Sequence, residues 1–159
     1  MTDMLIKLYD LEDDWSFMAV QREQGIAIRK PIGPEAHIIV KWVSDQFGAG
    51  WASEAEAALS NRPRSCFTAV KDSMILGFAC YDATALGFFG PIGVAASHRR
   101  KGTGTALMTA CLLDMKLKQY GYAIVGGVED TDYYLKNAKA VEIPDSSPGI
   151  YGKKLKIED

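Results

Sequence analysis

The segment 94–107 limits the possible folds more than any other part of the sequence. In it, an apolar stretch leads into three consecutive basic residues (99–101), which are followed by Gly102, Gly104 and a helix-like sequence. Glycine lets the backbone approach a ligand closely, and the first N–H groups of a helix are unpaired and carry the positive end of the helix dipole. A strand, a basic turn with glycines and a helix in this order predict a site for an anion, in particular a phosphate.

Spacing separates the known kinds of phosphate-binding loop. A Walker loop needs a lysine directly after its last glycine, whereas Lys101 precedes Gly102, so that motif is excluded. A dinucleotide-binding motif fits better, because the acidic pair 129–130 ends the next apolar run, where an acid that binds the ribose is expected. However, Leu107 stands where its third glycine belongs, and too little chain follows for a doubly wound sheet.

A third motif matches more closely. The pattern Arg99-x-x-Gly102-x-Gly104, after a strand that carries Ile92 and Val94, resembles the acyl-CoA pyrophosphate signature of the GNAT acyltransferase superfamily, Arg/Gln-x-x-Gly-x-Gly/Ala. The order of the expected elements from about residue 25 to the end of the sequence is also similar to that fold.

Composition indicates one globular domain over residues 1–159. The sequence has 48% apolar and 24% charged residues, enough for a substantial core. No run of about 18 apolar residues and no basic, apolar leader are present, so we expect neither a membrane span nor secretion, and a cytoplasmic location. The net charge of −2 argues against a nucleic-acid-binding surface.

The cysteines and histidines give no sign of a metal site. Cys66, Cys80 and Cys111 lie in apolar segments without the spacing of metal ligands, and we expect them to be reduced core residues. The two histidines, His37 and His98, are too few for a histidine-based site, so no metal is expected.

Hydrophobic periodicity and turn signals predict a mixed α/β fold. We expect a central mixed sheet of about six to seven strands, with an antiparallel meander, one parallel strand–helix–strand crossover and about four helices, and in addition an extra N-terminal strand–helix segment. The expected strands are 3–9, 26–29, 66–70, 75–81, 86–94, 122–128, 141–143 and 149–157; the expected helices are 11–23, 33–47, a short one with Ser53 and Glu56 in capping-box spacing, 103–120 and 132–139.

The first 24 residues lie outside the part that resembles the family. They predict an additional strand and helix with apolar side chains, among them Leu5, Trp15 and Phe17. Because such side chains need a surface to cover, we expect this extension to pack on the same domain or on a partner subunit of a homodimer.

The resemblance implies which residues bind acetyl-CoA. Main-chain groups of the strand before the loop would bind the pantetheine arm, and loop amides would bind the pyrophosphate. An N–H near Ile92 or Gly93 would stabilise the oxyanion. The residues to which these roles fall are Ile92, Val94, Ala96, Arg99, Arg100, Lys101, Gly102, Thr103, Gly104 and Thr105.

The resemblance also implies a general acid. The segment 132–136 is similar to the family's Phe-Tyr-x-Lys segment, which places the tyrosine that protonates the CoA thiolate at Tyr134. Gly-Phe does not follow as usual, so Tyr133 stays open as an alternative. An ammonium group must lose a proton before it attacks, and the candidate base is Glu129, with Asp130, Asp82 and Glu54 as alternatives.

We therefore expect an N-acetyltransferase that moves an acetyl group from acetyl-CoA, its cosubstrate, to an amine of a small molecule or peptide. The amine would attack directly in a ternary complex. The alternative is a non-catalytic acyl-CoA-binding or regulatory module on the same fold.

Overall fold

The computed structural model describes residues 1–158 and consists of one mixed sheet with helices on both faces. Seven strands follow the order β2-β3-β4-β5-β6-β1-β7. β5 and β6 are parallel, and the other neighbouring pairs are antiparallel. The strands are β1 Thr2–Lys7, β2 Ala27–Arg29, β3 Cys66–Lys71, β4 Met74–Tyr81, β5 Phe88–Val94, β6 Tyr122–Val128 and β7 Val141–Glu142.

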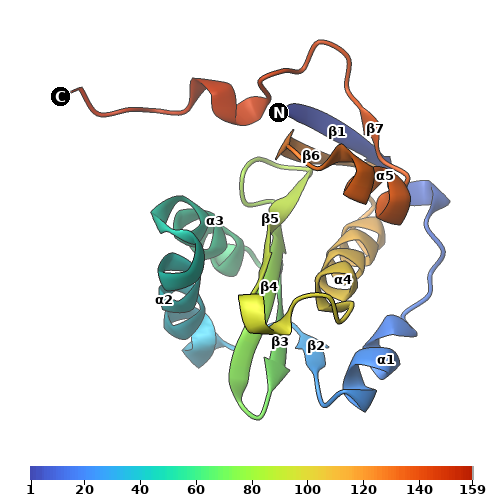
Figure 1. The fold of residues 1–159 in the computed structure, drawn as a ribbon, viewed down its shortest axis with the longest axis vertical. Coiled ribbons are helices and arrows are strands. Elements are labelled where there is room, and N and C mark those ends of the chain that lie inside the picture. The colour runs from blue at the N-terminus through green and yellow to red at the C-terminus, as the bar shows by residue number, and fades with distance from the viewer. Residues whose placement is uncertain (159) are drawn as a thin grey trace.

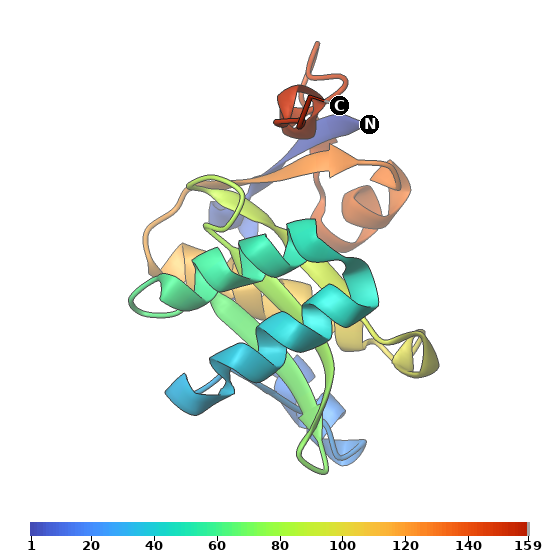
Figure 2. The ribbon, with the colours of Figure 1, turned by 90° about the vertical axis from the view of Figure 1, so that its left-hand side faces the viewer.

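Five α-helices connect the strands, so the predicted mixed α/β class, with an antiparallel meander and one parallel crossover, is confirmed. The helices are α1 Phe17–Glu23, α2 Ala36–Phe47, α3 Ala49–Ser60, α4 Thr103–Leu117 and α5 Thr131–Ala138. α4 forms the crossover between β5 and β6. α2 and α3 lie against one face of the central strands, and α4 lies against the other (Figures 1 and 2).

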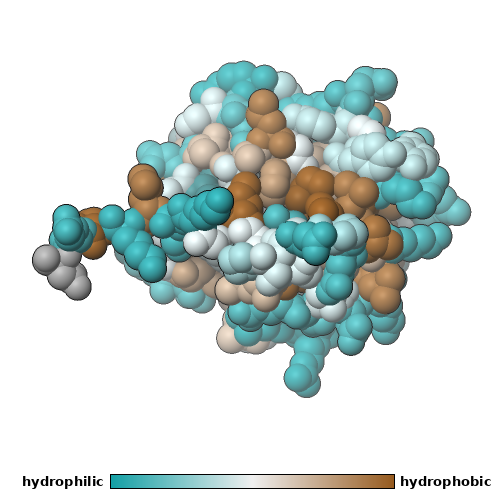
Figure 3. All heavy atoms as spheres, turned by 90° about the horizontal axis from the view of Figure 1, so that it is seen from above, coloured by the Kyte–Doolittle hydropathy of each residue, from teal (hydrophilic) through white to brown (hydrophobic). Residues whose placement is uncertain are grey.

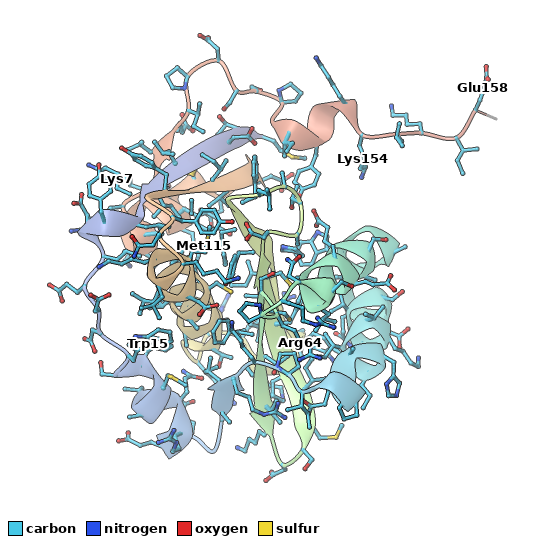
Figure 4. The ribbon with its side chains drawn as sticks, turned by 180° about the vertical axis from the view of Figure 1, so that it is seen from behind. Lys7, Trp15, Arg64, Met115, Lys154 and Glu158 are labelled. Atoms are coloured by element: carbon cyan, nitrogen blue, oxygen red, sulfur yellow. The ribbon has the colours of Figure 1, made fainter. Side chains whose placement is uncertain are left out.

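Each face of the sheet has its own hydrophobic core. Between the sheet and α4, the buried side chains include Met115 and Leu107, which are both 0% exposed. Figure 4 shows Met115 on the side of α4 nearest the sheet. On the other face, Phe78 and Val43 lie in a second cluster beneath α2 and α3. Burial of each such side chain contributes about 1.5–3 kcal/mol, so the two cores fix both helix layers on the sheet.

The N-terminal strand lies inside the sheet. β1 pairs with β6 from Thr2 opposite Val128 to Lys7 opposite Tyr122, and its other edge pairs with β7. α1, which follows, packs against β2 and α4. A short 3₁₀ turn, Leu8–Asp10, follows β1, and residues 11–16, the first part of the predicted helix 11–23, are not helical; Asp14 accepts a hydrogen bond from the Ser16 N–H there.

The predicted strand over 149–157 is wrong. Its first part is a short 3₁₀ turn, Ile150–Lys153, and the following residues up to 158 form no strand. The reason is that β1 already pairs with the edge of β6 that a last strand would need. Leu155 and Ile157 are each 95% exposed in the segment that leads away from the domain, where Figure 4 labels Lys154 and Glu158.

The predicted capping box is also wrong. α3 begins at Ala49, directly after Gly48, whose φ of 100° ends α2 and turns the chain. Ser53 therefore lies inside the helix instead of at its start. Gly48 alone separates the two helices, which is why they form a tight antiparallel pair over the sheet (Figure 2).

The upper end of the molecule exposes apolar surface. Figure 3, seen from this side, shows hydrophobic patches among hydrophilic ones. β7, α5 and the C-terminal turn lie at this end (Figure 1), and their exposed apolar side chains are Val141, Leu135 and Ile150.

Candidate functional site

The loop between β5 and α4 has the backbone geometry of an anion site. A 3₁₀ turn, Ala96–His98, follows β5, and the chain then takes positive φ values at Arg100 (64°) and Gly102 (77°). α4 begins at Thr103, with Gly102 in the left-handed conformation just before it. Alternation between right- and left-handed backbone turns successive N–H groups toward the same side of a loop.

These N–H groups are unpaired. Within residues 1–158, the main-chain N–H groups of 100–105 have no hydrogen-bond acceptor, and the first α4 bond is donated by Ala106 to Gly102. Arg99, Arg100 and Lys101 are exposed and form no ion pair in the same part of the chain. A set of free N–H groups, a helix of 15 residues and three cationic side chains suit a multiply charged anion such as a pyrophosphate.

A buried glutamine on α1 holds the loop in place. Gln21 is 3% exposed; its Nε2 donates to the Lys101 carbonyl at 3.2 Å, and its Oε1 accepts from the Thr103 hydroxyl at 2.9 Å. Gln24 donates to the same carbonyl at 3.4 Å. The sequence analysis missed Gln21, although its position four residues after Phe17 puts a polar side chain on the apolar face of the expected helix.

β5 and β6 separate just before this loop. In the described chain, their paired residues are Phe88 with Ile124 and Phe89 with Val125, and beyond these the two strands are no longer paired. The antiparallel ladder with β4 continues to the end of β5, where the Ala95 N–H donates to Leu76 at 2.8 Å.

The alternating pattern of that ladder determines which main-chain groups of β5 form no hydrogen bond with β4. Gly93 lies opposite Phe78, two residues before the bonded Ala95, so its polar groups point toward β4. The N–H and C=O groups of Ile92 and Val94 consequently point toward the side of β6, which has moved away. There the Val94 carbonyl accepts a hydrogen bond from Arg99 Nε at 3.0 Å.

The predicted cofactor-binding residues are thus continuous in space. Ile92 and Val94 lie on the free edge of β5, and Ala96 is exposed at the start of the 3₁₀ turn. Arg99 to Gly102 form the loop, and Thr103, Gly104 and Thr105 form the first turn of α4.

α5 brings two tyrosines to the start of α4. The Tyr133 hydroxyl lies 3.0 Å from the Thr105 hydroxyl, and the Asp130 side chain caps the helix by accepting from the Tyr133 N–H. The Tyr134 hydroxyl has no hydrogen-bond partner within residues 1–158. Burial raises the pKa of Tyr134 to about 12, with smaller contributions from Tyr133 and Asp130. Tyr134 therefore stays protonated, with its hydroxyl free to donate.

The candidate bases differ in their surroundings. Glu129 is exposed directly after β6 and forms no hydrogen bond or ion pair with residues 1–158. Asp82 is occupied, because one oxygen accepts from the Tyr120 hydroxyl and the other from the Gly87 N–H. Glu54 on α3 accepts from the hydroxyls of Thr84 and Tyr151.

A cavity of about 810 Å³ lies elsewhere, between α2 and α3, and includes Val40, Ala52 and Arg64 in its lining. None of the predicted site residues lines it.

In the part of the chain that the structure describes, no group of three His, Cys, Asp or Glu side chains could hold a metal ion. None of the helices in that part combines the length and the apolar character needed to cross a membrane.

The model of the acetyltransferase (GNAT) family matches residues 36–136. The chain belongs to the GNAT acetyltransferase family. The matched range contains the loop between β5 and α4, Glu129 and Tyr134, and leaves out β1 and α1. Acyl transfer is the general activity for which this family is named.

Several solved structures share the fold of this chain. The GCN5-related glucosamine N-acetyltransferase region of a fungal multi-domain GH3 β-N-acetylglucosaminidase is similar over 89% of this chain and 19% of that chain, with a TM-score of 0.72 and 13% identity. A GCN5-related N-acetyltransferase from Sphaerobacter thermophilus has a TM-score of 0.66 and 18% identity over 89% of this chain and 48% of its own.

An N-acetyltransferase that is matched over nearly its whole length shares the fold as well. The ribosomal-protein-alanine N-acetyltransferase from Brucella melitensis biovar Abortus 2308 is matched over 77% of this chain and 96% of its own, with a TM-score of 0.54 and 20% identity. By contrast, the chain spans less than half the length of the first two structures. No curated protein matches the sequence.

Proposed function

We propose that the protein is an N-acetyltransferase that transfers the acetyl group of acetyl-CoA to an amine of a small molecule or peptide. The observation that carries this proposal is the continuity between the unpaired N–H groups at the start of α4 and the free edge of β5. The unpaired N–H groups suit a pyrophosphate, and the free edge of β5 suits an extended arm that contains amide groups. Acetyl-CoA has both parts in this order.

The chain stabilises the reaction mainly through its backbone. The amine nitrogen attacks the thioester carbonyl carbon directly, in a ternary complex, and negative charge develops on the carbonyl oxygen. The Ile92 N–H, which points away from β4, is the donor for that oxygen, because a fixed N–H group stabilises a developing oxyanion without reorganisation. The carbon–sulfur bond then breaks, and CoA leaves as a thiolate.

Tyr134 acts on the departing sulfur. Its pKa of about 12 lies well above that of an ordinary thiol, so complete proton transfer to the thiolate would be uphill. The Tyr134 hydroxyl therefore stabilises the thiolate by donating a hydrogen bond. Tyr133 is the weaker candidate, since its hydroxyl is already in contact with Thr105.

A general base must remove a proton from the ammonium group of the acceptor, and we propose Glu129 for this role. An ammonium substrate loses two protons in forming the amide; one is finally held by the CoA thiol, and the other passes to solvent. Glu129 is exposed, has no partner in residues 1–158 and lies at the end of β6, close in sequence to the helix that carries Tyr134. These features favour it over Asp82, whose two oxygens are occupied.

Binding and turnover assays test the proposal. Calorimetry should show that acetyl-CoA and CoA bind while NAD and ATP do not, since the site fits the combination of pyrophosphate and pantetheine. An assay of CoA release against a library of amines should then detect acetyl transfer. Binding of acetyl-CoA without turnover of any amine would indicate a non-catalytic acyl-CoA-binding module, and preferential binding of NAD would refute both.

A further inference from the structure

Three side chains from distant parts of the sequence meet on the α3 face of the sheet. The Glu54 carboxylate oxygen Oε1 accepts from the Thr84 hydroxyl at 2.5 Å and from the Tyr151 hydroxyl at 2.9 Å. The two hydroxyls are 2.9 Å apart. Glu54 lies on α3, Thr84 in the loop between β4 and β5, and Tyr151 in the C-terminal 3₁₀ turn, so three separate segments converge on one carboxylate.

This cluster borders the place where β5 and β6 separate. An ideal Cβ at Gly127 would lie 2.8 Å from the Tyr151 ring, and one at Gly126 would lie 2.7 Å from Ile150. Both glycines come directly after Val125, the last β6 residue paired with β5. Tyr151 therefore covers the β6 backbone at the separation, and its hydroxyl reaches across to α3.

The position of Tyr151 is fixed from the other side by the N-terminal strand. Asp3 Oδ1 accepts hydrogen bonds from the Gly127 N–H at 2.9 Å and from the Ile150 N–H at 3.2 Å. One β1 carboxylate thus ties the C-terminal turn to β6. Tyr151 is held by the fold rather than by contact with Glu54 alone.

Aromatic rings border the same region from α2 and α3. Trp51 precedes Glu54 by three residues, which places both on one side of α3, and it is 37% exposed. Its ring lies 5.0 Å from that of Phe47. Phe47 in turn packs on Gly93 of β5, where an ideal Cβ would lie 2.5 Å from the ring, so no larger residue fits beneath it.

Glu54 is a carboxylate without a counter-ion. It forms no ion pair with residues 1–158, and its second oxygen, Oε2, has no hydrogen-bond partner among them. The hydroxyls of Thr84 and Tyr151 orient the group but leave its charge uncompensated. A fixed negative charge next to aromatic rings attracts an organic cation through the charge itself and through cation–π contacts.

On the basis of the proposed acetyl transfer, we infer that the acceptor is a monocationic amine with an apolar or aromatic body, whose ammonium group binds the Glu54 carboxylate beside Trp51. Glu54 is then a specificity-determining residue. It favours amines without a carboxylate over amino acids, because a second negative charge beside it is repelled.

A matched pair of ligands tests this inference. Phenethylamine and phenylalanine share the ring and the ammonium group, and phenylalanine adds a carboxylate. With CoA present, calorimetry on the wild-type protein should give a Kd for phenethylamine at least about tenfold lower than for phenylalanine. In Glu54→Gln, phenethylamine should bind at least about tenfold more weakly, and its preference over phenylalanine should fall below about threefold.

Glu54→Gln keeps an oxygen that can accept from both hydroxyls, so it removes the charge while preserving the contacts. Glu56→Gln, an exposed glutamate on the same helix, is the matched control and should leave both affinities unchanged. If acetyl-CoA binds but phenethylamine does not, or if both variants behave alike, the inference is wrong. If the wild-type protein does not bind acetyl-CoA, the proposed function fails and the inference fails with it.

Discussion

Replacing Gln21 by leucine tests how the loop between β5 and α4 is held in place. Gln21 joins α1 to the loop by two hydrogen bonds, one to the Lys101 carbonyl and one from the Thr103 hydroxyl, which is 1% exposed. Leucine has a similar volume but cannot accept a hydrogen bond. Gln21→Leu therefore leaves a buried hydroxyl without its acceptor and a loop carbonyl without its buried donor.

The expected loss follows from the burial of Thr103. A buried polar group left without a partner costs about 1–3 kcal/mol. For a domain of this size, a loss of about 2 kcal/mol lowers the Tm by roughly 4–8 °C. If the freed loop holds its N–H groups in the binding conformation about a tenth of the time, the affinity for acetyl-CoA falls about tenfold.

Urea unfolding and calorimetry with acetyl-CoA measure the two effects. Gln24→Leu is the control, because Gln24 is exposed and its bond to Lys101 is long, and it should change stability by less than about 0.5 kcal/mol. The double variant Gln21→Leu with Thr103→Val should be more stable than the sum of the single losses predicts, since it leaves no orphaned hydroxyl. A stability of Gln21→Leu within about 0.5 kcal/mol of the wild type would refute the reasoning.

Three further predictions concern the loop, Tyr134 and one ion pair. Gly104→Val should weaken acetyl-CoA binding at least about tenfold in calorimetry without unfolding the protein, because an ideal Cβ there meets Val94 at an ordinary 3.7 Å; the equivalent change at Gly50, the second residue of α3, controls for helix propensity. Tyr134→Phe should lower kcat about 10²–10⁴-fold with little change in acetyl-CoA affinity, and Tyr133→Phe should not; equal losses in both would show that the assignment of Tyr134 alone is wrong. The hydrogen bonds from Arg29 lower the pKa of Glu35 to about 2, from a usual value of 4.5. Because the folded-state pKa is depressed, Glu35→Gln should lose roughly 1 kcal/mol at pH 7, and the difference should vanish as the pH falls from about 4.5 to about 2 in urea titrations.

Local patterns predicted most of the fold. The meander, the crossover helix and β6 follow from apolar periodicity and turn residues that lie close together in the sequence. The loop between β5 and α4 was predicted from the spacing of Arg99, Gly102 and Gly104, because two glycines this close together permit a tight turn before a helix. Such features can be predicted without knowing which distant segments of the chain are in contact.

Features that depend on distant segments could not be predicted. Pairing of β1 with β6 leaves no sign in either segment, so the C-terminal residues were assigned to a strand whose expected place beside β6 is occupied by β1. The contact of Tyr151 with Glu54 likewise joins α3 to the C-terminal turn. Glu54 was one of several candidate bases from sequence, but only the structure shows which of these carboxylates accept hydrogen bonds and from which side chains.

The place of β1 between β6 and β7 also has a consequence for folding. The ribosome makes β1 well before β6 and β7, so Met4 and Ile6, buried in the native sheet, stay exposed until these two neighbouring strands have emerged. Strands so far apart in the sequence pair slowly, because closing the long loop between them costs conformational entropy before the stabilising contacts form. Until they form, β6 presents an open edge that another chain can pair with. The nascent protein is therefore most prone to aggregate in the interval between the synthesis of β6 and its pairing with β1.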